Sequence, residues 1–161
     1  MKKLPVVREF MSVSLITLRP GMDIFQAIDV LVKNRISGAP VVDDGHNLIG
    51  VLSEKDCLRV FANNAFYHLD AGLVEDFMTR EVCTVDPDDD IFKVADMFLK
   101  NNFRRLPVLA AGRLVGQVSR RDVLNMSRKM AEEPPVPKEW TDAKYLTPEI
   151  KAALADRQSE G

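Results

Sequence analysis

The sequence predicts an α+β protein in which the segment order β-α-β-β-α occurs twice along the chain. Three observations support this. Many residues recur at a spacing of 67 positions. Each copy carries amphipathic helical segments together with short segments rich in β-branched residues. Each copy ends on the pattern Gly-x-x-Ser-x-x-Asp, at residues 50–56 and 116–122. We therefore expect two small mixed sheets with helices packed on them.

The repeat divides the chain into two copies of about sixty residues. The matching pairs include Met11 and Met78, Thr17 and Thr84, Pro20 and Pro87, and Pro40 and Pro107. One residue is lost in the second hairpin turn, so the closing Ser and Asp lie 66 positions apart. A unit of this size buries too little surface to be stable alone, so the copies should pack on each other. The expected divisions are residues 5–66, 67–130 and a tail at 131–161.

The first elements of each copy lead from a short helical turn into a capped helix. The turns are expected at residues 7–11 and 74–78, followed by extended segments around 16–18 and 83–85. Asp23 and Asp90 stand where a helix N-cap is needed. Apolar residues then recur at helical spacing as far as Asn34 and Asn101.

The remaining elements of each copy form a hairpin and a second helix. Strands are expected at residues 39–42 and 48–52, and again at 106–109 and 114–118. Pro40 and Pro107 are placed at strand starts, where a missing N–H donor is tolerated. The tail contains a proline-rich linker at 131–137 and a predicted helix from Glu149 to about Arg157.

Composition and charge exclude several classes of protein. The net charge of −2 argues against a general binder of nucleic acid or membrane surfaces. No apolar run approaches the roughly 20 residues that span a bilayer. The N-terminus begins like a signal peptide, but Arg8 and Glu9 interrupt it. Cys57 and Cys83 lack paired spacing, which indicates reduced packing residues of a cytoplasmic protein.

The Ser-x-x-Asp stretch that closes each copy has two interpretations. In the first it is a capping box, in which Ser accepts from the Asp N–H and Asp accepts from the Ser N–H. In the second the helix start binds a phosphate, and the ionised Asp accepts from both hydroxyls of a ribose. One residue pair can serve both purposes.

Other candidate chemistry is sparse. His46 and His68 have no ligand-forming neighbours, so surface positions are expected. No pattern of a nucleophile with its base appears, so the protein is not expected to be an enzyme. The acidic run Asp86, Asp88, Asp89 and Asp90 is interpreted as helix-start chemistry and not as a metal site. Arginines gather near the strand-helix junctions of the second copy and suit phosphate: Arg104, Arg105, Arg120 and Arg121.

Four motifs in the same order in both copies resemble a tandem pair of cystathionine-beta-synthase (CBS) domains. They are Phe10-Met11 and Phe77-Met78-Thr79, Thr17 to Pro20 and Thr84 to Pro87, residues 38–42 and 105–108, and the Gly-x-x-Ser-x-x-Asp endings. The resemblance covers about residues 5–127. It implies two repeats packed about a pseudo-twofold axis. It also implies a regulatory module that binds an adenosyl ligand (AMP, ADP, ATP, S-adenosylmethionine or a dinucleotide) in clefts between the halves.

The resemblance also implies how each cleft is assembled, with the leading loop of one half facing the Ser and Asp of the other. The residues expected at one site are Ser119, Asp122, Arg105, Arg121, Arg35, Met11, Val13, Leu15 and Thr17. Those expected at the other are Ser53, Asp56, Asn102, Met78, Arg80, Val82 and Thr84. Asn102 and Gly38 replace Arg35 and Arg105 in this second site, so a weaker phosphate site, an adenosine-like pocket or an empty one is expected there.

The sequence therefore favours a sensor of adenine nucleotides that modulates a partner protein. The alternative is a structural dimerisation or docking module with vestigial clefts, which the tail residues Trp140, Tyr145 and Leu146 would serve. RNA binding through the arginines conflicts with the acidic balance. A homodimer is also expected, by the resemblance and because apolar residues gather near the terminal helices, namely Val7, Leu58, Phe61, Leu73, Val74, Phe77, Val123 and Leu124.

Overall fold

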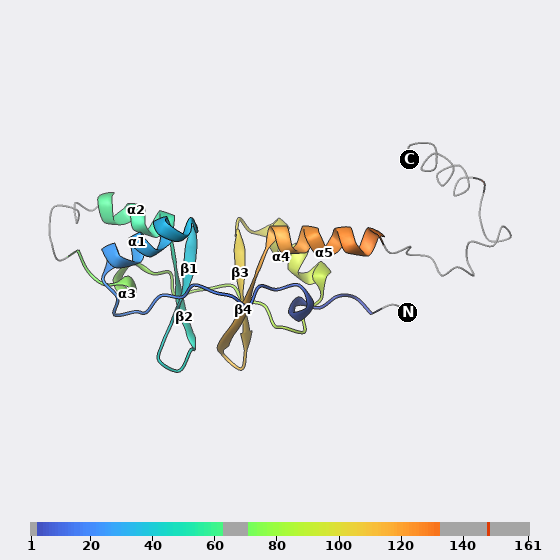
Figure 1. Ribbon diagram of the computed structural model, residues 1–161, viewed down its shortest axis with the longest axis horizontal. Helices are drawn as coiled ribbons and strands as arrows, with labels where there is room; N and C mark the ends of the chain where they lie inside the picture. Colours follow the sequence, from blue (N-terminus) through green and yellow to red (C-terminus); the bar gives the residue numbers. More distant parts are fainter. Residues whose placement is uncertain (1–2, 63–70, 133–147, 149–161) are drawn as a thin grey trace. The chain divides into compact units, whose positions relative to one another are not determined.

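The computed structural model describes residues 3–62, 71–132 and 148, and Figure 1 shows its helices and strands. Met1–Val123 forms one compact unit, and Leu124–Gly161 belongs to a second unit that is considered by itself. The first repeat contributes α1 (Ile24–Asn34), β1 (Gly38–Val42), β2 (Leu48–Ser53) and α2 (Glu54–Ala62). The second contributes α4 (Ile91–Lys100), β3 (Arg105–Ala110), β4 (Arg113–Ser119) and α5 (Arg120–Glu132). The predicted α+β class and its duplicated element order are confirmed.

The two long helices of the compact unit begin where their caps predict. The Asp23 carboxylate accepts from the N–H groups of Phe25 and Gln26, at 2.9 and 3.3 Å. The Asp90 carboxylate accepts from Phe92 and Lys93 in the same way, at 2.9 and 3.0 Å. Each cap satisfies backbone donors that the first turn of a helix leaves without intrahelical partners.

The acidic residues before α4 form hydrogen bonds within the start of this helix and the turn before it. The Asp86 carboxylate accepts from the Asp88 N–H, and Asp89 accepts from the Asp86 N–H and from Lys93. Among the residues that the structure describes, no cluster of three or more His, Cys, Asp or Glu side chains could hold a metal ion.

Each sheet is a two-stranded antiparallel hairpin extended by single bridges. β1 pairs with β2, and β3 pairs with β4. The expected first strand of each repeat is only one bridge long, because Leu18 pairs in parallel with Val41, and Val85 with Val108. Two hydrogen bonds hold each of these bridges, such as Leu18 N–H to Pro40 C=O at 2.9 Å. The sheets themselves are antiparallel, and the parallel pairing expected of the first strand is limited to these single bridges.

The prolines of β1 and β3 lie inside the strands and not at their starts. Pro40 is opposite Val51, whose own N–H and C=O are bonded to Thr79 on the far side of β2. Pro40 therefore occupies a pair that exchanges no hydrogen bonds with β2, so its missing N–H leaves the ladder intact. Pro107 has the equivalent place opposite Gln117.

The segment that precedes each repeat packs on the other repeat. Val7, in the short turn η1 (Val7–Glu9), is fully buried with Val85, Val94 and Phe98 of the second repeat. Conversely, Val74 of α3 (Val74–Phe77) is buried in the core of the first repeat. Figure 1 shows η1 near α4, and α3 beside α1 and α2. The two hydrophobic cores are thus each completed by a segment from elsewhere in the chain.

These exchanged segments correct one expectation about the surface. The sequence predicts that a second subunit covers Val7 and Val74, but both are fully buried within the chain. Leu58, Phe61, Leu73 and Leu124 are exposed, as expected. Fewer exposed apolar residues therefore remain for a second subunit to cover than the sequence predicts.

The two hairpin tips meet at positions that are counterparts in the repeat. Asn47 forms an antiparallel bridge with Arg113, the residue that matches it 66 positions later. The Leu48 N–H donates to Gly112 at 3.4 Å, and the Leu114 N–H donates to His46 at 3.2 Å. Because a pair of equivalent residues can bond reciprocally only across a twofold axis, the hairpin tips lie on the pseudo-twofold axis of the unit.

Some expectations fall on parts of the chain that the structure does not describe. His46 is on the surface in the hairpin turn, as expected, whereas His68 lies outside the described residues. The helix predicted from Glu149 to Arg157 and the aromatic residues Trp140 and Tyr145 also lie outside them. Within the described part of the chain, no helix has the length and apolar character needed to cross a membrane.

Candidate functional site

Both Ser-x-x-Asp stretches form capping boxes. The Asp122 carboxylate accepts from the Ser119 N–H at 2.7 Å and from the Ser119 hydroxyl at 2.8 Å. The Asp122 N–H in turn lies 3.2 Å from Ser119 Oγ. Ser53 and Asp56 repeat the arrangement at 2.9, 2.8 and 3.1 Å. The capping interpretation of the motif is confirmed for both repeats.

The two carboxylates differ in what their second oxygen does. Asp56 Oδ1 accepts from the Arg59 guanidinium at 3.2 Å, and the residue is only 4% exposed. Arg59 is replaced by Asn125 at the matching place of the second repeat. No donor among the described residues reaches Asp122 Oδ1, and Asp122 is half-buried. Asp122 therefore keeps one acceptor oxygen available to a ligand.

Asp122 lines a cavity of about 260 Å³ in the compact unit. Ser119 and Arg105 come from the second repeat, and Ile36 and Gly38 from the first. The loop at residues 12–16 closes another wall, because Ser12 exchanges two hydrogen bonds with Gln117, at 2.8 and 2.9 Å. A helix start, an available carboxylate and a guanidinium thus meet in one place. This combination suits a ribose and a phosphate.

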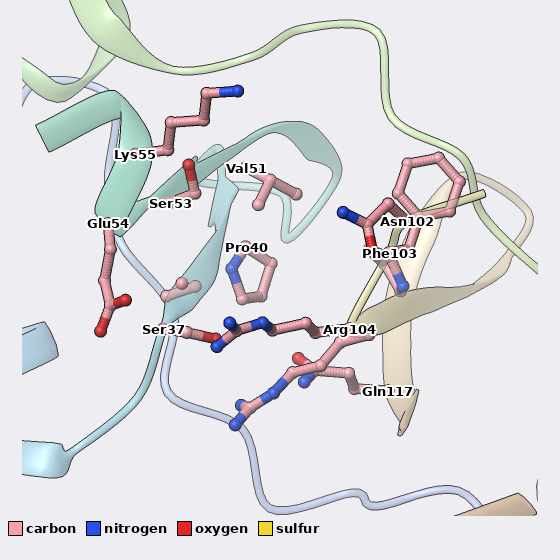
Figure 2. A pocket seen from close by; sticks show the side chains of 14 residues that line it. Ser37, Pro40, Val51, Ser53, Glu54, Lys55, Asn102, Phe103, Arg104 and Gln117 are labelled. Atoms are coloured by element: carbon pink, nitrogen blue, oxygen red, sulfur yellow. The ribbon is translucent and has the colours of Figure 1, made fainter. Parts of the chain in front are cut away.

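A larger cavity of about 410 Å³ contains Ser53. Figure 2 shows the first repeat supplying Ser37, Pro40, Val51, Glu54 and Lys55, and the second supplying Asn102, Phe103, Arg104 and Gln117. Arg105 lines this cavity as well. This site was expected to lack the counterparts of Arg35 and Arg105, yet Arg104 and Arg105 themselves line the cavity from the second repeat.

The structure brings some predicted site residues together and leaves others outside. Ser119, Asp122, Arg105 and Leu15 line the smaller cavity, and Ser53 and Asn102 line the larger one. The predicted residues that line neither are Met11, Val13, Thr17, Arg35, Arg121, Asp56, Met78, Arg80, Val82 and Thr84.

Three of the residues outside the cavities have other roles. Arg35 ends α1 in the left-handed conformation at φ 53°, and Ile36 takes the place expected for it in the smaller cavity. Met11 and Met78 pack over Gly116 and Gly50, where a β-carbon would stand 2.5 and 2.6 Å from their sulfurs. The repeated methionines are therefore packing residues that fix the leading loops on the neighbouring strands.

Gln117, Arg104 and Lys55 are lining residues that the prediction of the site omitted. Strand alternation could have found Gln117, because side chains two apart in a strand share a face and Ser119 follows at that distance. Arg104 and Lys55 carry no such signal. Their approach to one cavity depends on how the two repeats pack, which the sequence of either repeat does not specify.

The cysteines differ in environment. Cys57 is buried next to Asp56, and burial, followed by the charges of Asp56 and Glu54, raises the pKa of its thiol to about 11. It stays a neutral packing residue at physiological pH, as predicted. Cys83 is exposed, so the prediction that it is a packing residue is wrong.

Comparison with known proteins assigns the family. The model of the CBS domain matches the chain twice, at residues 7–63 and 74–129. The chain belongs to the CBS-domain family. It is 35% identical over 121 residues to the protein MJ1225 of Methanocaldococcus jannaschii, a match that covers 74% of this chain. The chain spans 42% of that relative's length.

Solved structures of CBS pairs have the same fold. The crystal structure of CBSX2, a protein of Arabidopsis thaliana, in complex with AMP is 29% identical with a TM-score of 0.70. The match covers 78% of this chain and 98% of that one. The CBS pair of MJ0100 in complex with 5′-methylthioadenosine and S-adenosyl-L-methionine is 28% identical with a TM-score of 0.66. That match covers 82% of this chain and 100% of the other.

Proposed function

We propose that this chain is a regulatory, non-catalytic module that binds an adenosyl ligand in the cavity beside Asp122. The observation that carries the proposal is the available Oδ1 of Asp122 in a cavity that also contains Arg105 and the start of α5. The ribose hydroxyls donate to Asp122. The phosphate binds Arg105 and the N–H groups at the helix start. The structures of related pairs with AMP and with S-adenosyl-L-methionine support the adenosyl class.

A regulatory role requires the ligand to bind two states of the module with different affinity. The cavity is built from both repeats and from the loop at residues 12–16, so a ligand there contacts segments that must move together if the repeats shift. We propose that this shift changes the affinity for a client protein. Because both described cysteines are unpaired, we place the module in the cytoplasm.

Calorimetric titration tests the binding proposal. AMP, ADP, ATP, S-adenosylmethionine and 5′-methylthioadenosine are titrated separately into the full chain, and at least one should give saturable heat. Thermal melting with each compound provides an independent measure, because a ligand that binds only the folded state raises the melting temperature. The absence of both signals for every compound would overturn the proposed function.

We further propose a homodimer in which the exposed apolar side chains of α2 are covered by a second copy. Leu58 is 65% exposed on this helix, although Cys57 and Val60 beside it are buried. Light scattering should give about 36 kDa, twice the 18.1 kDa of one chain. Leu58→Glu should shift the mass towards one chain. A wild-type mass of about 18 kDa at high concentration contradicts the dimer.

A further inference from the structure

The two cavities share a boundary. Gly38, Arg105 and Gln117 line both of them. Gly38 and Arg105 are also counterparts in the repeat, 67 positions apart. At this junction one repeat contributes an arginine and the other contributes no side chain. The single guanidinium at the boundary therefore belongs to both cavities, and a ligand in one cavity has Arg105 between it and the other.

The larger cavity is strongly cationic and the smaller one is not. Lys55, Arg104 and Arg105 line the larger cavity together with one acidic residue, Glu54. The smaller cavity is lined by one cation, Arg105, and by one carboxylate, that of Asp122. Within the described part of the chain, none of these three cations forms an ion pair. A recess lined by three cations and one acidic residue carries a net positive charge, which favours an anion with several charges.

Figure 2 shows the cations of the larger cavity on two sides of it, with the Lys55 ammonium directed away from Arg104. Arg104 extends from the second repeat towards Ser37 of the first repeat, and Lys55 follows Ser53 at the start of α2. The counterparts of Arg104 and Asn102 in the first repeat are Ser37 and Arg35, and Arg35 does not line the smaller cavity. The two cavities are therefore not equivalent, although the repeats that form them are.

We propose that one nucleoside polyphosphate occupies both cavities. Its nucleoside lies in the smaller cavity against Asp122, its first phosphate binds Arg105 at the boundary, and the remaining phosphates bind Arg104 in the larger cavity. This inference rests on the proposed function, because the nucleoside part of the ligand is held by the site described there. It adds that the module distinguishes nucleotides by the length of their phosphate chain.

Two consequences can be measured. Affinity should rise in the order AMP, ADP, ATP, since each added phosphate reaches further cations. ATP should bind with a stoichiometry of one per chain, because its phosphates fill the cavity that a second nucleotide would need. Inorganic tripolyphosphate should compete with ATP more strongly than with AMP. The preference for ATP over AMP should weaken as salt is added, because exposed cations are screened.

The decisive measurement is the ratio of the AMP dissociation constant to the ATP dissociation constant. Arg104→Gln should lower this ratio by about tenfold, for a lost charge-assisted hydrogen bond. Lys55→Gln should lower it less, because the Lys55 ammonium is directed away from Arg104. Arg105→Gln should weaken the binding of both AMP and ATP. Arg113→Gln is the matched control, because Arg113 is exposed and lines neither cavity. Thermal melting without ligand shows whether each variant is folded.

The outcomes separate this inference from the proposed function. If AMP binds but ATP binds no tighter, or if ATP binds with a stoichiometry of two, the shared ligand is wrong and the adenosyl site stands. The same holds if Arg104→Gln leaves the ratio unchanged. If no nucleotide binds at all, the proposed function fails, and the shared ligand fails with it.

Discussion

The sulfur of Met11 lies 2.5 Å from the point where Gly116 would carry a β-carbon. Real β-carbons essentially never approach another atom so closely. Met11 can therefore occupy this position only because residue 116 has no side chain. The contact joins the loop that leads into the first repeat to strand β4 of the second. The same relationship holds between Met78 and Gly50, with the repeats exchanged. It explains why both a methionine and a glycine recur in the sequence.

Gly116→Ala should destabilise the protein by about 1–3 kcal/mol, because the added methyl group displaces Met11 and presses on the Ser12 carbonyl oxygen at 3.0 Å. Urea unfolding measures the loss. Gly21→Ala is the control, since nothing lies within 4 Å of its β-carbon. Met11→Ala in the Gly116→Ala background should cost less than the sum of the two single changes. Additive losses would show that the two residues are not in contact in solution.

Val7→Ala should cost about 2 kcal/mol of stability, because the side chain is fully buried in the core of the second repeat. Val13 provides the comparison, since it lies six positions later and is 72% exposed. Val13→Ala should change the free energy of unfolding by less than about 0.5 kcal/mol. Equal effects of the two substitutions would contradict the exchange of the leading segments.

Asp122→Ala should weaken nucleotide binding by about tenfold or more, because it removes the acceptor for the ribose hydroxyls. Asp56→Ala should weaken binding less, since its free oxygen is already taken by Arg59 and the side chain does not line either cavity. Calorimetry with AMP measures both variants. A larger loss for Asp56→Ala would place the principal nucleoside site in the other repeat.

The same pair of variants should rank in the opposite order for stability. Each loses a helix cap, which costs about 1 kcal/mol. Asp56 is buried and its removal also leaves Arg59 without a partner, so Asp56→Ala should have the lower melting temperature. Melting without ligand therefore separates a loss of fold from a loss of contacts.

The stability of the protein should fall at alkaline pH partly through Cys57. Its pKa rises from 9.0 to about 11 on folding, so the folded state holds the thiol proton more tightly than the unfolded state. This contribution is complete below about pH 9 and is lost as the pH rises towards 11. The stability difference between wild type and Cys57→Ala should shrink over that interval. Cys83→Ala, a substitution at the exposed cysteine, is the control variant.

Much of the fold could be predicted because it is local. Asp23 and Asp90 cap their helices through contacts two and three residues away, and the turns and amphipathic faces are equally short-range. The burial of Val7 and Val74 could not be predicted in the same way. Both are valines, so neither size nor hydrophobicity indicates which of the two cores each side chain enters. The packing of the whole chain determines this.

The local part of the site could also be predicted, whereas its contacts between distant segments could not. Ser119 and Asp122 are found from their spacing, because a capping box has one geometry. Arg59 distinguishes Asp56 from Asp122, and the sequence alone shows only that Arg59 and Asn125 differ. Arg104 reaches the cavity of Ser53 across the boundary between the repeats. Such a contact between distant segments has no periodicity from which it could be inferred.

The exchange of leading segments has a consequence for how such a chain arose. A single ancestral repeat would have carried an arm with Val7 or Val74 that its own core did not need, and a core that lacked an arm. In a dimer of two separate copies, the leading segment of each copy could pack in the core of the other, as in a domain-swapped dimer. Joining the two genes would then have made that exchange intramolecular. In such an ancestor, the counterparts of Asn47 and Arg113, which pair across the twofold axis, would lie where the two subunits met.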